Sequence, residues 1–156
     1  MNDPKSNFNR NVLIGVDDSD NARRAVSYVG QMLADVQGSR IILLHVIPEP
    51  EADFFPDLRD RDRWIGRYRQ KMTNLLETYR REMNNRGIPA DDIDILIKER
   101  FCPSMAECIL QEREKLRCDT IVVGRQGISR SEEFLFGSVS SKIVTHARNC
   151  TVWVVE

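Results

Sequence analysis

Short apolar segments rich in valine and isoleucine recur along the chain, and they constrain its fold more than any other feature. Four of them run over Asn11–Val16, Arg40–Ile47, Thr120–Val123 and Thr151–Val155. Strands that are apolar on both faces belong to sheets that are covered on both sides. A fifth segment, Ile93–Lys98, alternates only in part and is expected to form a strand with one wetter face, at an edge of the sheet.

Segments with helical periodicity separate these strands. The first begins at Ser19, a favourable N-cap residue, and the second is the highly charged Asp57–Asn85, which carries a single apolar stripe. The third begins at Ser104, which has capping-box spacing with Glu107, and the fourth is Val139–Ala147. Helices that connect strands in this order must cross over, which predicts an α/β fold with a parallel sheet and helices on both faces.

The length and charge of the chain narrow its function. The 156 residues have the size of one domain, so we predict a single domain over residues 1–156, with a polar and flexible stretch over residues 1–10. The formal net charge of −1 gives no general attraction to nucleic acid or to acidic membranes. No apolar run approaches the roughly 20 residues that span a bilayer, and residues 1–10 lack the apolar core of a secretory signal. We therefore expect a cytoplasmic protein that binds neither nucleic acid nor membranes.

The cysteines and histidines form no metal or catalytic pattern. The cysteines are Cys102, Cys108, Cys118 and Cys150, and none of them belongs to a Cys-x-x-Cys pair. His45 and His146 do not cluster with them, so a zinc site is not expected and the thiols are expected to be reduced. His45 lies inside an apolar strand, where a hydrogen-bonded core histidine is expected rather than a catalytic base. No Ser/His/Asp triad or carboxylate pair emerges by spacing, so nothing argues for nucleophilic catalysis.

A glycine-rich segment follows the fourth predicted strand. It reads Gly124-Arg-Gln-Gly127, then nine residues, then Gly137-Ser138 at the start of the fourth predicted helix. Glycine lets the backbone turn sharply and approach a ligand closely, and a helix N-terminus favours anions, phosphate above all. The groups expected to face a phosphate are the N–H groups of Gly137, Ser138 and Val139 and the hydroxyls of Ser138 and Ser140.

Spacing alone leaves two interpretations of this segment open. It is neither a P-loop, because Lys142 comes too late, nor a Gly-x-Gly-x-x-Gly dinucleotide motif. The glycines either form a phosphate site, with Arg125 and Arg130 available to neutralise phosphate charge, or only solve a packing problem between strand and helix. Asp17, directly after the first strand, is equally open: its carboxylate either accepts hydrogen bonds from a base or ribose or caps the helix in competition with Ser19.

Three segments of the chain share a pattern with a known family. They are Val12-Leu-Ile-Gly-Val-Asp-Asp-Ser19, Leu43-Leu-His-Val46, and the stretch from Val122 through Gly137-Ser-Val-Ser-Ser141. Together they resemble the universal stress protein family over nearly the whole chain. The nucleotide motif of that family is Gly-x2-Gly-x9-Gly-Ser/Thr, and it is complete here as Gly124, Gly127, Gly137 and Ser138.

The resemblance implies a fold and a ligand. The implied fold is an open parallel sheet of five strands in the order 3-2-1-4-5, of the adenine nucleotide α-hydrolase-like kind, which places the first and fourth strands side by side. Members with an intact motif bind ATP, so the implied ligand is ATP, or else AMP or ADP, with Mg²⁺ carried by the phosphates. Carried over by position, the implied adenosine contacts are Val16, Asp17 and Val46, the ribose and phosphate contacts are Val123, Gly124 and Gly127, and the phosphate contacts are Gly137, Ser138, Val139 and Ser140.

The resemblance also implies a homodimer through the last strand, Thr151–Val155, where Trp153 at an edge fits burial by a partner. The leading hypothesis is therefore a cytoplasmic, ATP-binding stress-response protein that acts as a nucleotide-gated regulatory module. One alternative is a slow ATP hydrolase, although no residue near the motif is an evident base for activating water. Another alternative is a dimeric interaction protein that does not depend on nucleotide.

Overall fold

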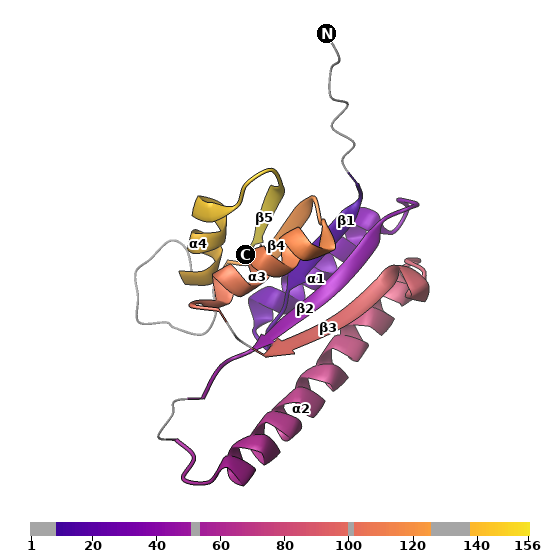
Figure 1. Ribbon diagram of the computed structural model, residues 1–156. Coiled ribbons are helices and arrows are strands. Elements are labelled where there is room, and N and C mark those ends of the chain that lie inside the picture. Colours follow the sequence, from indigo (N-terminus) through magenta and orange to yellow (C-terminus); the bar gives the residue numbers. More distant parts are fainter. Residues whose placement is uncertain (1–8, 51–53, 100–101, 126–137) are drawn as a thin grey trace.

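The structure is a computed structural model that describes residues 9–50, 54–99, 102–125 and 138–156, and these form a parallel sheet between two layers of helices (Figure 1). The elements in chain order are β1 (Asn11–Gly15), α1 (Asp20–Leu33), β2 (Arg40–Ile47), α2 (Leu58–Asn85), the short 3-10 helix η1 (Ala90–Asp92), β3 (Ile93–Glu99), α3 (Met105–Leu116), β4 (Thr120–Gly124), α4 (Ser138–His146) and β5 (Thr151–Val155). Neighbouring strands are parallel throughout, in the order β3-β2-β1-β4-β5. The predicted α/β fold and its strand order are therefore confirmed, as is the edge position of β3.

Alternate residues of each strand contribute to two separate cores, one under each helix layer. In β1, Val12 and Ile14 pack with α1 and α2, whereas Leu13 between them packs with α3 and α4. In β2, every residue from Ile41 to Ile47 is buried. Burial of the central strands on both faces explains why their sequences are continuously apolar.

Short polar side chains cap helices α1 and α3 at the predicted positions. The Ser19 hydroxyl accepts a hydrogen bond from the Ala22 N–H (3.1 Å), and the Ser104 hydroxyl accepts one from the Glu107 N–H (3.3 Å). A cap of this kind contributes about 1 kcal/mol to stability. The starts of these helices are therefore determined locally, by residues that the sequence shows directly.

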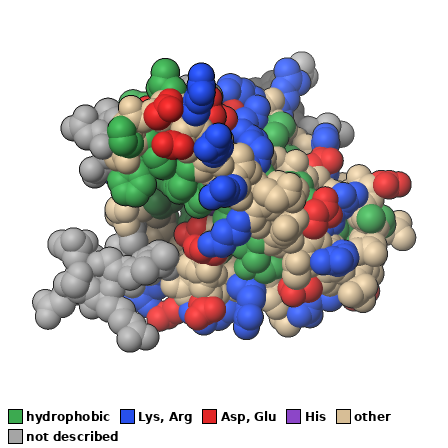
Figure 2. All heavy atoms as spheres, turned by 90° about the horizontal axis from the view of Figure 1, so that it is seen from below, with side chains coloured by type: hydrophobic (Ala, Val, Ile, Leu, Met, Phe, Trp, Pro, Cys, Tyr) green, Lys and Arg blue, Asp and Glu red, His purple; other side chains and the backbone are tan. Residues whose placement is uncertain are grey.

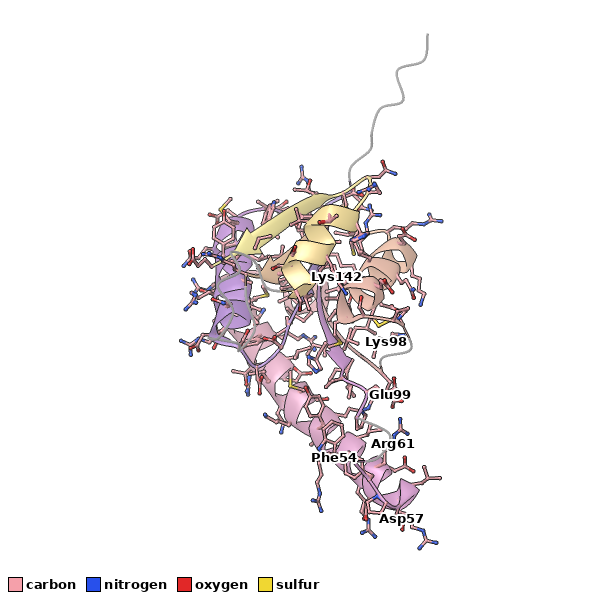
Figure 3. All side chains as sticks on the ribbon, turned by 90° about the vertical axis from the view of Figure 1, so that its left-hand side faces the viewer. Phe54, Asp57, Arg61, Lys98, Glu99 and Lys142 are labelled. Carbon is pink, nitrogen blue, oxygen red and sulfur yellow. A yellow bond between two sulfur atoms is a disulfide. The ribbon has the colours of Figure 1, made fainter. Side chains whose placement is uncertain are left out.

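Helix α2 is longer than the strands that it covers, and only its second half is buried. Its buried residues are Met72, Leu76, Tyr79 and Met83. The first half projects beyond the carboxyl ends of β2 and β3 (Figure 1), and Figure 3 shows Phe54, Asp57 and Arg61 at this projecting end, below Glu99. Figure 2, which looks onto the same end of the molecule, shows hydrophobic side chains at the surface with charged side chains around them. Neither α2 nor any other helix in the described ranges combines the length and apolar character that crossing a membrane requires.

Two of the four cysteines, Cys102 and Cys108, form a disulfide, so the expectation that all thiols are reduced is wrong for this pair. Their Cα atoms lie 5.5 Å apart, within the usual range for a disulfide. Cys102 precedes the N-cap of α3 and Cys108 lies inside that helix, so the bond ties the helix to the segment that enters it. Cys118 and Cys150 are free thiols, and burial raises the pKa of Cys118 to about 11.

Titration of thiols in denaturant without reductant is expected to find only Cys118 and Cys150, and all four cysteines after reduction. Because the disulfide closes a short loop, the double replacement Cys102→Ser and Cys108→Ser is expected to lower the free energy of unfolding by about 2 kcal/mol, or the melting temperature by roughly 4–8 °C. Cys150→Ser serves as the control and is expected to leave the melting temperature nearly unchanged. Four reactive thiols before reduction would contradict the disulfide.

Candidate functional site

Of the predicted site residues, those in the described part of the chain lie at the carboxyl ends of β1, β2 and β4 and at the start of α4, beside the reversal of strand order between β1 and β4. β1 pairs with β2 on one side and with β4 on the other, so that Gly15 lies opposite both Leu44 and Val123. The segments that follow Gly15 and Gly124 therefore leave neighbouring strands at the same edge of the sheet. In parallel α/β sheets this edge, at such a reversal, is where ligands bind.

Val16 and Asp17 form the turn between β1 and α1. The Val16 N–H donates to the Leu44 carbonyl oxygen (2.8 Å), which extends the pairing of β1 with β2 by one residue. One carboxylate oxygen of Asp17, Oδ1, accepts a hydrogen bond from the Ser19 N–H (2.9 Å). Ser19, and not Asp17, is the N-cap residue of α1. Asp17 thus shapes the turn, and its half-buried carboxylate retains further acceptor capacity toward a ligand.

Val46 presents its backbone at the same place. Its side chain belongs to the core under α3 and α4. Peptide groups alternate along a strand, so those of Val46 point the same way as those of Leu44, toward the β1 side of β2. The last β1 residue paired with β2 is Gly15, opposite Leu44. The Val46 peptide groups therefore face the edge at which Val16 and Asp17 turn away.

Gly124, at the end of β4, is required by packing within the chain. Val123, which precedes it, is buried in the core under α3 and α4. A Cβ atom on Gly124 would lie 2.8 Å from the carbonyl carbon and the Cβ of Asn21 and 3.0 Å from the Ala22 nitrogen. Packing of β4 against the first turn of α1 is therefore by itself a reason for glycine at position 124, whether or not Gly124 also contacts a ligand. Gly127 and Gly137, the other glycines of the motif, lie outside the described residues.

Two polar groups predicted to face phosphate are engaged within the chain. Ser140 is buried and its hydroxyl donates to the Arg125 carbonyl oxygen (2.8 Å), which ties the first turn of α4 to the end of β4. The Arg125 guanidinium forms an ion pair with Glu156 (2.5 Å). At the start of α4, Ser138 is exposed and Val139 is half-buried. Arg130 lies outside the described residues.

His45, which the sequence assigns to the core, lies directly beside the predicted site. It is 2% exposed, its Nδ1–H donates to the Val16 carbonyl oxygen (2.6 Å), and its Nε2 accepts from the Tyr68 hydroxyl (3.2 Å). Burial lowers the pKa of His45, and the Val16 carbonyl, Asp17 and Asp18 oppose this shift. Burial, with Asp18 and Asp17, also raises the pKa of Tyr68. His45 is therefore a neutral, satisfied core histidine, as predicted.

Helix α2 makes a second contact with this edge of the sheet. Lys71 Nζ lies 3.0 Å from a carboxylate oxygen of Asp18, the residue after Asp17. Both side chains are substantially exposed, so the ion pair positions α2 more than it stabilises the fold. No cluster of three or more His, Cys, Asp or Glu side chains that could hold a metal ion occurs in the described parts of the chain.

The sequence of the chain matches universal stress proteins in two comparisons. The model of the universal stress protein family matches residues 9–156. A curated relative from Thermus aquaticus, the universal stress protein in the QAH/OAS sulfhydrylase 3′ region, is 28% identical over 147 residues, which cover 94% of this chain and 98% of the relative.

Solved structures of the same group share the fold. The universal stress protein UspA from Lactobacillus plantarum has a TM-score of 0.79 and 20% identity, and the match covers 96% of this chain and 99% of that one. A universal stress protein from Archaeoglobus fulgidus in complex with dAMP has a TM-score of 0.64 and 16% identity, covering 93% and 96%. A universal stress protein in complex with cAMP has a TM-score of 0.59 and 22% identity, covering 96% and 98%.

Proposed function

Because the chain belongs to the universal stress protein family, we propose that it is a cytoplasmic regulatory protein that binds an adenine nucleotide, ATP in the first place. The proposal is supported by the placement of Asp17, Val46 and the entry to α4 beside the carboxyl ends of the neighbouring strands β1, β2 and β4, next to the reversal of strand order. Members of the same fold group hold cAMP and dAMP, both adenine nucleotides.

The contacts around the site sharpen the role of each residue. The Val16 N–H donates to Leu44 and its carbonyl accepts from His45, so we assign Val16 an apolar contact with adenosine. Asp17 is the acceptor for the ribose or base, and the Val46 peptide groups are available to the base edge. Polar groups at fixed positions in an otherwise apolar site are what give a ligand its orientation.

The phosphates are assigned to the segment between β4 and α4. Gly127, Gly137, Ser138 and Val139 remain predicted contacts there, as do Val123 and Gly124 for the ribose. Because the Ser140 hydroxyl already donates to Arg125, we assign its phosphate contact to the backbone N–H, at the positive end of the helix dipole. Mg²⁺ would bind through the phosphates of the nucleotide, and an ion bound in this way does not need a dedicated set of protein ligands. AMP and ADP would use the same adenosine contacts.

We propose binding rather than hydrolysis. Titratable side chains with described contacts at this edge include Asp17, Asp18, Lys71, His45 and Tyr68, and Asp18 is paired with Lys71. Both His45 nitrogens are hydrogen-bonded within the chain, and burial holds its ring neutral. Asp17 is hydrogen-bonded to the turn that it shapes. Neither is arranged as a base for an attacking water.

Replacing Asp17 by asparagine is expected to weaken ATP binding about tenfold, because the charged acceptor for adenosine is lost. The amide oxygen of asparagine can still accept from the Ser19 N–H, so the turn is expected to persist. Asp20→Asn is the matched control, because Asp20 is an exposed carboxylate in the first turn of α1 with no assigned contact to the nucleotide, and this variant is expected to leave affinity nearly unchanged. Titration calorimetry with ATP and Mg²⁺ measures both variants, after analysis of the purified wild type for bound nucleotide. Failure of the wild type to bind at millimolar ATP would overturn the proposed function.

We also propose a homodimer formed through the exposed edge of β5. β5 has no strand on its outer side in the described sheet, and its last four residues are half-buried. Trp153 packs edge-on against Tyr28 of α1 (ring centroids 5.9 Å apart), and Tyr28 and Met32 are 43% and 51% exposed. An unpaired strand edge beside exposed apolar side chains is a surface that a second chain can cover.

A further inference from the structure

A continuous hydrogen-bond path runs from helix α2 to the end of β1. The Tyr68 hydroxyl donates to His45 Nε2 (3.2 Å), and His45 Nδ1–H donates to the Val16 carbonyl oxygen (2.6 Å). We propose that Tyr68 and His45 are positioning residues for the nucleotide, because this path fixes the peptide that carries Asp17. The proposal rests on the function proposed above and adds two residues that are not part of the Gly-x2-Gly-x9-Gly-Ser nucleotide motif.

The direction of each hydrogen bond follows from the chemistry of its partner. A carbonyl oxygen only accepts, so Nδ1 of His45 carries the proton. In a neutral ring Nε2 is then the acceptor, and the Tyr68 hydroxyl is its donor. Burial of His45 favours this neutral form by lowering its pKa. The ring is therefore held in one tautomer and one orientation.

The end of the path at α2 is itself held in place. Trp64 stacks on Tyr68, with ring centroids 5.1 Å apart and an interplanar angle of 21°, and Phe55 contacts Trp64 at 5.8 Å. On the next turn of α2, Lys71 pairs with Asp18 (3.0 Å). Helix α2 is therefore linked to the chain on both sides of Asp17, through His45 to the Val16 carbonyl and directly through Lys71 to the Asp18 carboxylate.

The path sets the spacing of the two groups assigned to adenosine. His45 directly precedes Val46 in β2, and its imidazole holds the Val16 carbonyl, directly before Asp17. The distance between the Val46 peptide and the Asp17 carboxylate is thus fixed by a side chain as well as by strand pairing, whose last hydrogen bond on this side is from the Val16 N–H to the Leu44 carbonyl. Binding groups held rigidly in their bound arrangement gain both affinity and selectivity. Loss of the path is expected to weaken discrimination between adenine and guanine nucleotides.

The decisive variant is Tyr68→Phe, which deletes the hydroxyl and keeps the ring that stacks on Trp64. It is expected to bind ATP about three- to tenfold more weakly, the usual effect of one hydrogen bond, and to reduce the preference for ATP over GTP. Tyr79→Phe is the matched control, because Tyr79 is a buried tyrosine in the second half of the same helix. Its affinity and base preference are expected to equal those of the wild type.

A second pair of variants and a spectroscopic readout separate positioning from general stability. His45→Asn retains an N–H donor near the Nδ1 position and is expected to bind better than His45→Leu. Nitrogen-15 spectra of His45 in the free protein are expected to show a single Nδ1–H tautomer, and the Nε2 signal is expected to shift in Tyr68→Phe. The charged groups that face the His45 ring are Asp17 and Asp18. The control variant Tyr79→Phe is expected to leave the nitrogen-15 signals of His45 unchanged.

The outcomes distinguish the two proposals. If the wild type binds ATP and Tyr68→Phe binds it with unchanged affinity and base preference, the positioning role is wrong while the proposed function stands. An unchanged His45 spectrum in Tyr68→Phe would also overturn the positioning role. If the wild type binds no adenine nucleotide, the proposed function falls and the positioning role falls with it.

Discussion

Replacement of Gly124 by alanine is expected to lower the free energy of unfolding by about 2–3 kcal/mol, the usual cost of overpacking a rigid contact. The new Cβ would lie 2.8 Å from the Asn21 carbonyl carbon and Cβ and 3.0 Å from the Ala22 nitrogen. These atoms belong to the first turn of α1 and are mostly backbone, so they cannot give way by a change of rotamer. Either β4 or α1 must shift, and the Ser19 cap lies next to the contact.

Gly66→Ala is the matched control and is expected to change stability in the opposite direction. Gly66 is exposed inside α2, and a Cβ there meets no atom within 4 Å. Alanine in a helix is more favourable than glycine by about 0.5–1 kcal/mol. Urea unfolding of both variants without nucleotide measures the packing effect alone. Equal stability of Gly124→Ala and the wild type would show that packing does not require Gly124 and would leave its predicted ribose contact as the reason for a glycine there.

The sequence predicts the strands well because their signal is local. The predicted bounds of β2 and β5 agree with the structure, Arg40–Ile47 and Thr151–Val155. β1 ends at Gly15, one residue before the predicted end, and β4 reaches Gly124, one residue beyond it. Strand ends depend on which neighbour is still paired, and that information lies in other parts of the chain.

Contacts between distant residues explain what the sequence does not reveal about the site. From its helical spacing Tyr68 belongs to the apolar stripe predicted for Asp57–Asn85, and nothing in that spacing indicates its hydrogen bond to His45, 23 residues away. The sequence predicts that the Ser140 hydroxyl donates to a phosphate. In the fold this hydroxyl donates instead to the Arg125 carbonyl, 15 residues away. The disulfide between Cys102 and Cys108 depends on the turn before α3, which the spacing of the cysteines does not show. The position of Asp17, by contrast, follows from its place after an apolar strand.

Replacement of Val154 by proline is expected to convert the proposed homodimer into monomers while leaving the fold intact. The Thr151 N–H donates to the Asp119 carbonyl (2.8 Å), and the Val155 carbonyl accepts from the Arg125 N–H (2.7 Å). Peptide groups alternate along a strand, so those of Val154 point away from β4, toward the free edge. Proline is tolerated at such an edge position, where it removes one outward N–H and its ring blocks the approach of another strand.

Trp153→Pro is expected to destabilise the fold, and this contrast with Val154→Pro tests which peptide groups of β5 face β4. By the same alternation the Trp153 N–H points toward β4, so proline there removes a hydrogen bond within the sheet and is expected to lower the melting temperature strongly. Sedimentation velocity at matched concentrations is expected to show a dimer for the wild type and a monomer for Val154→Pro, with similar melting temperatures after correction for dimer dissociation. A dimer of unchanged affinity in Val154→Pro would exclude pairing through β5 and direct the search to the exposed Tyr28 and Met32 on α1.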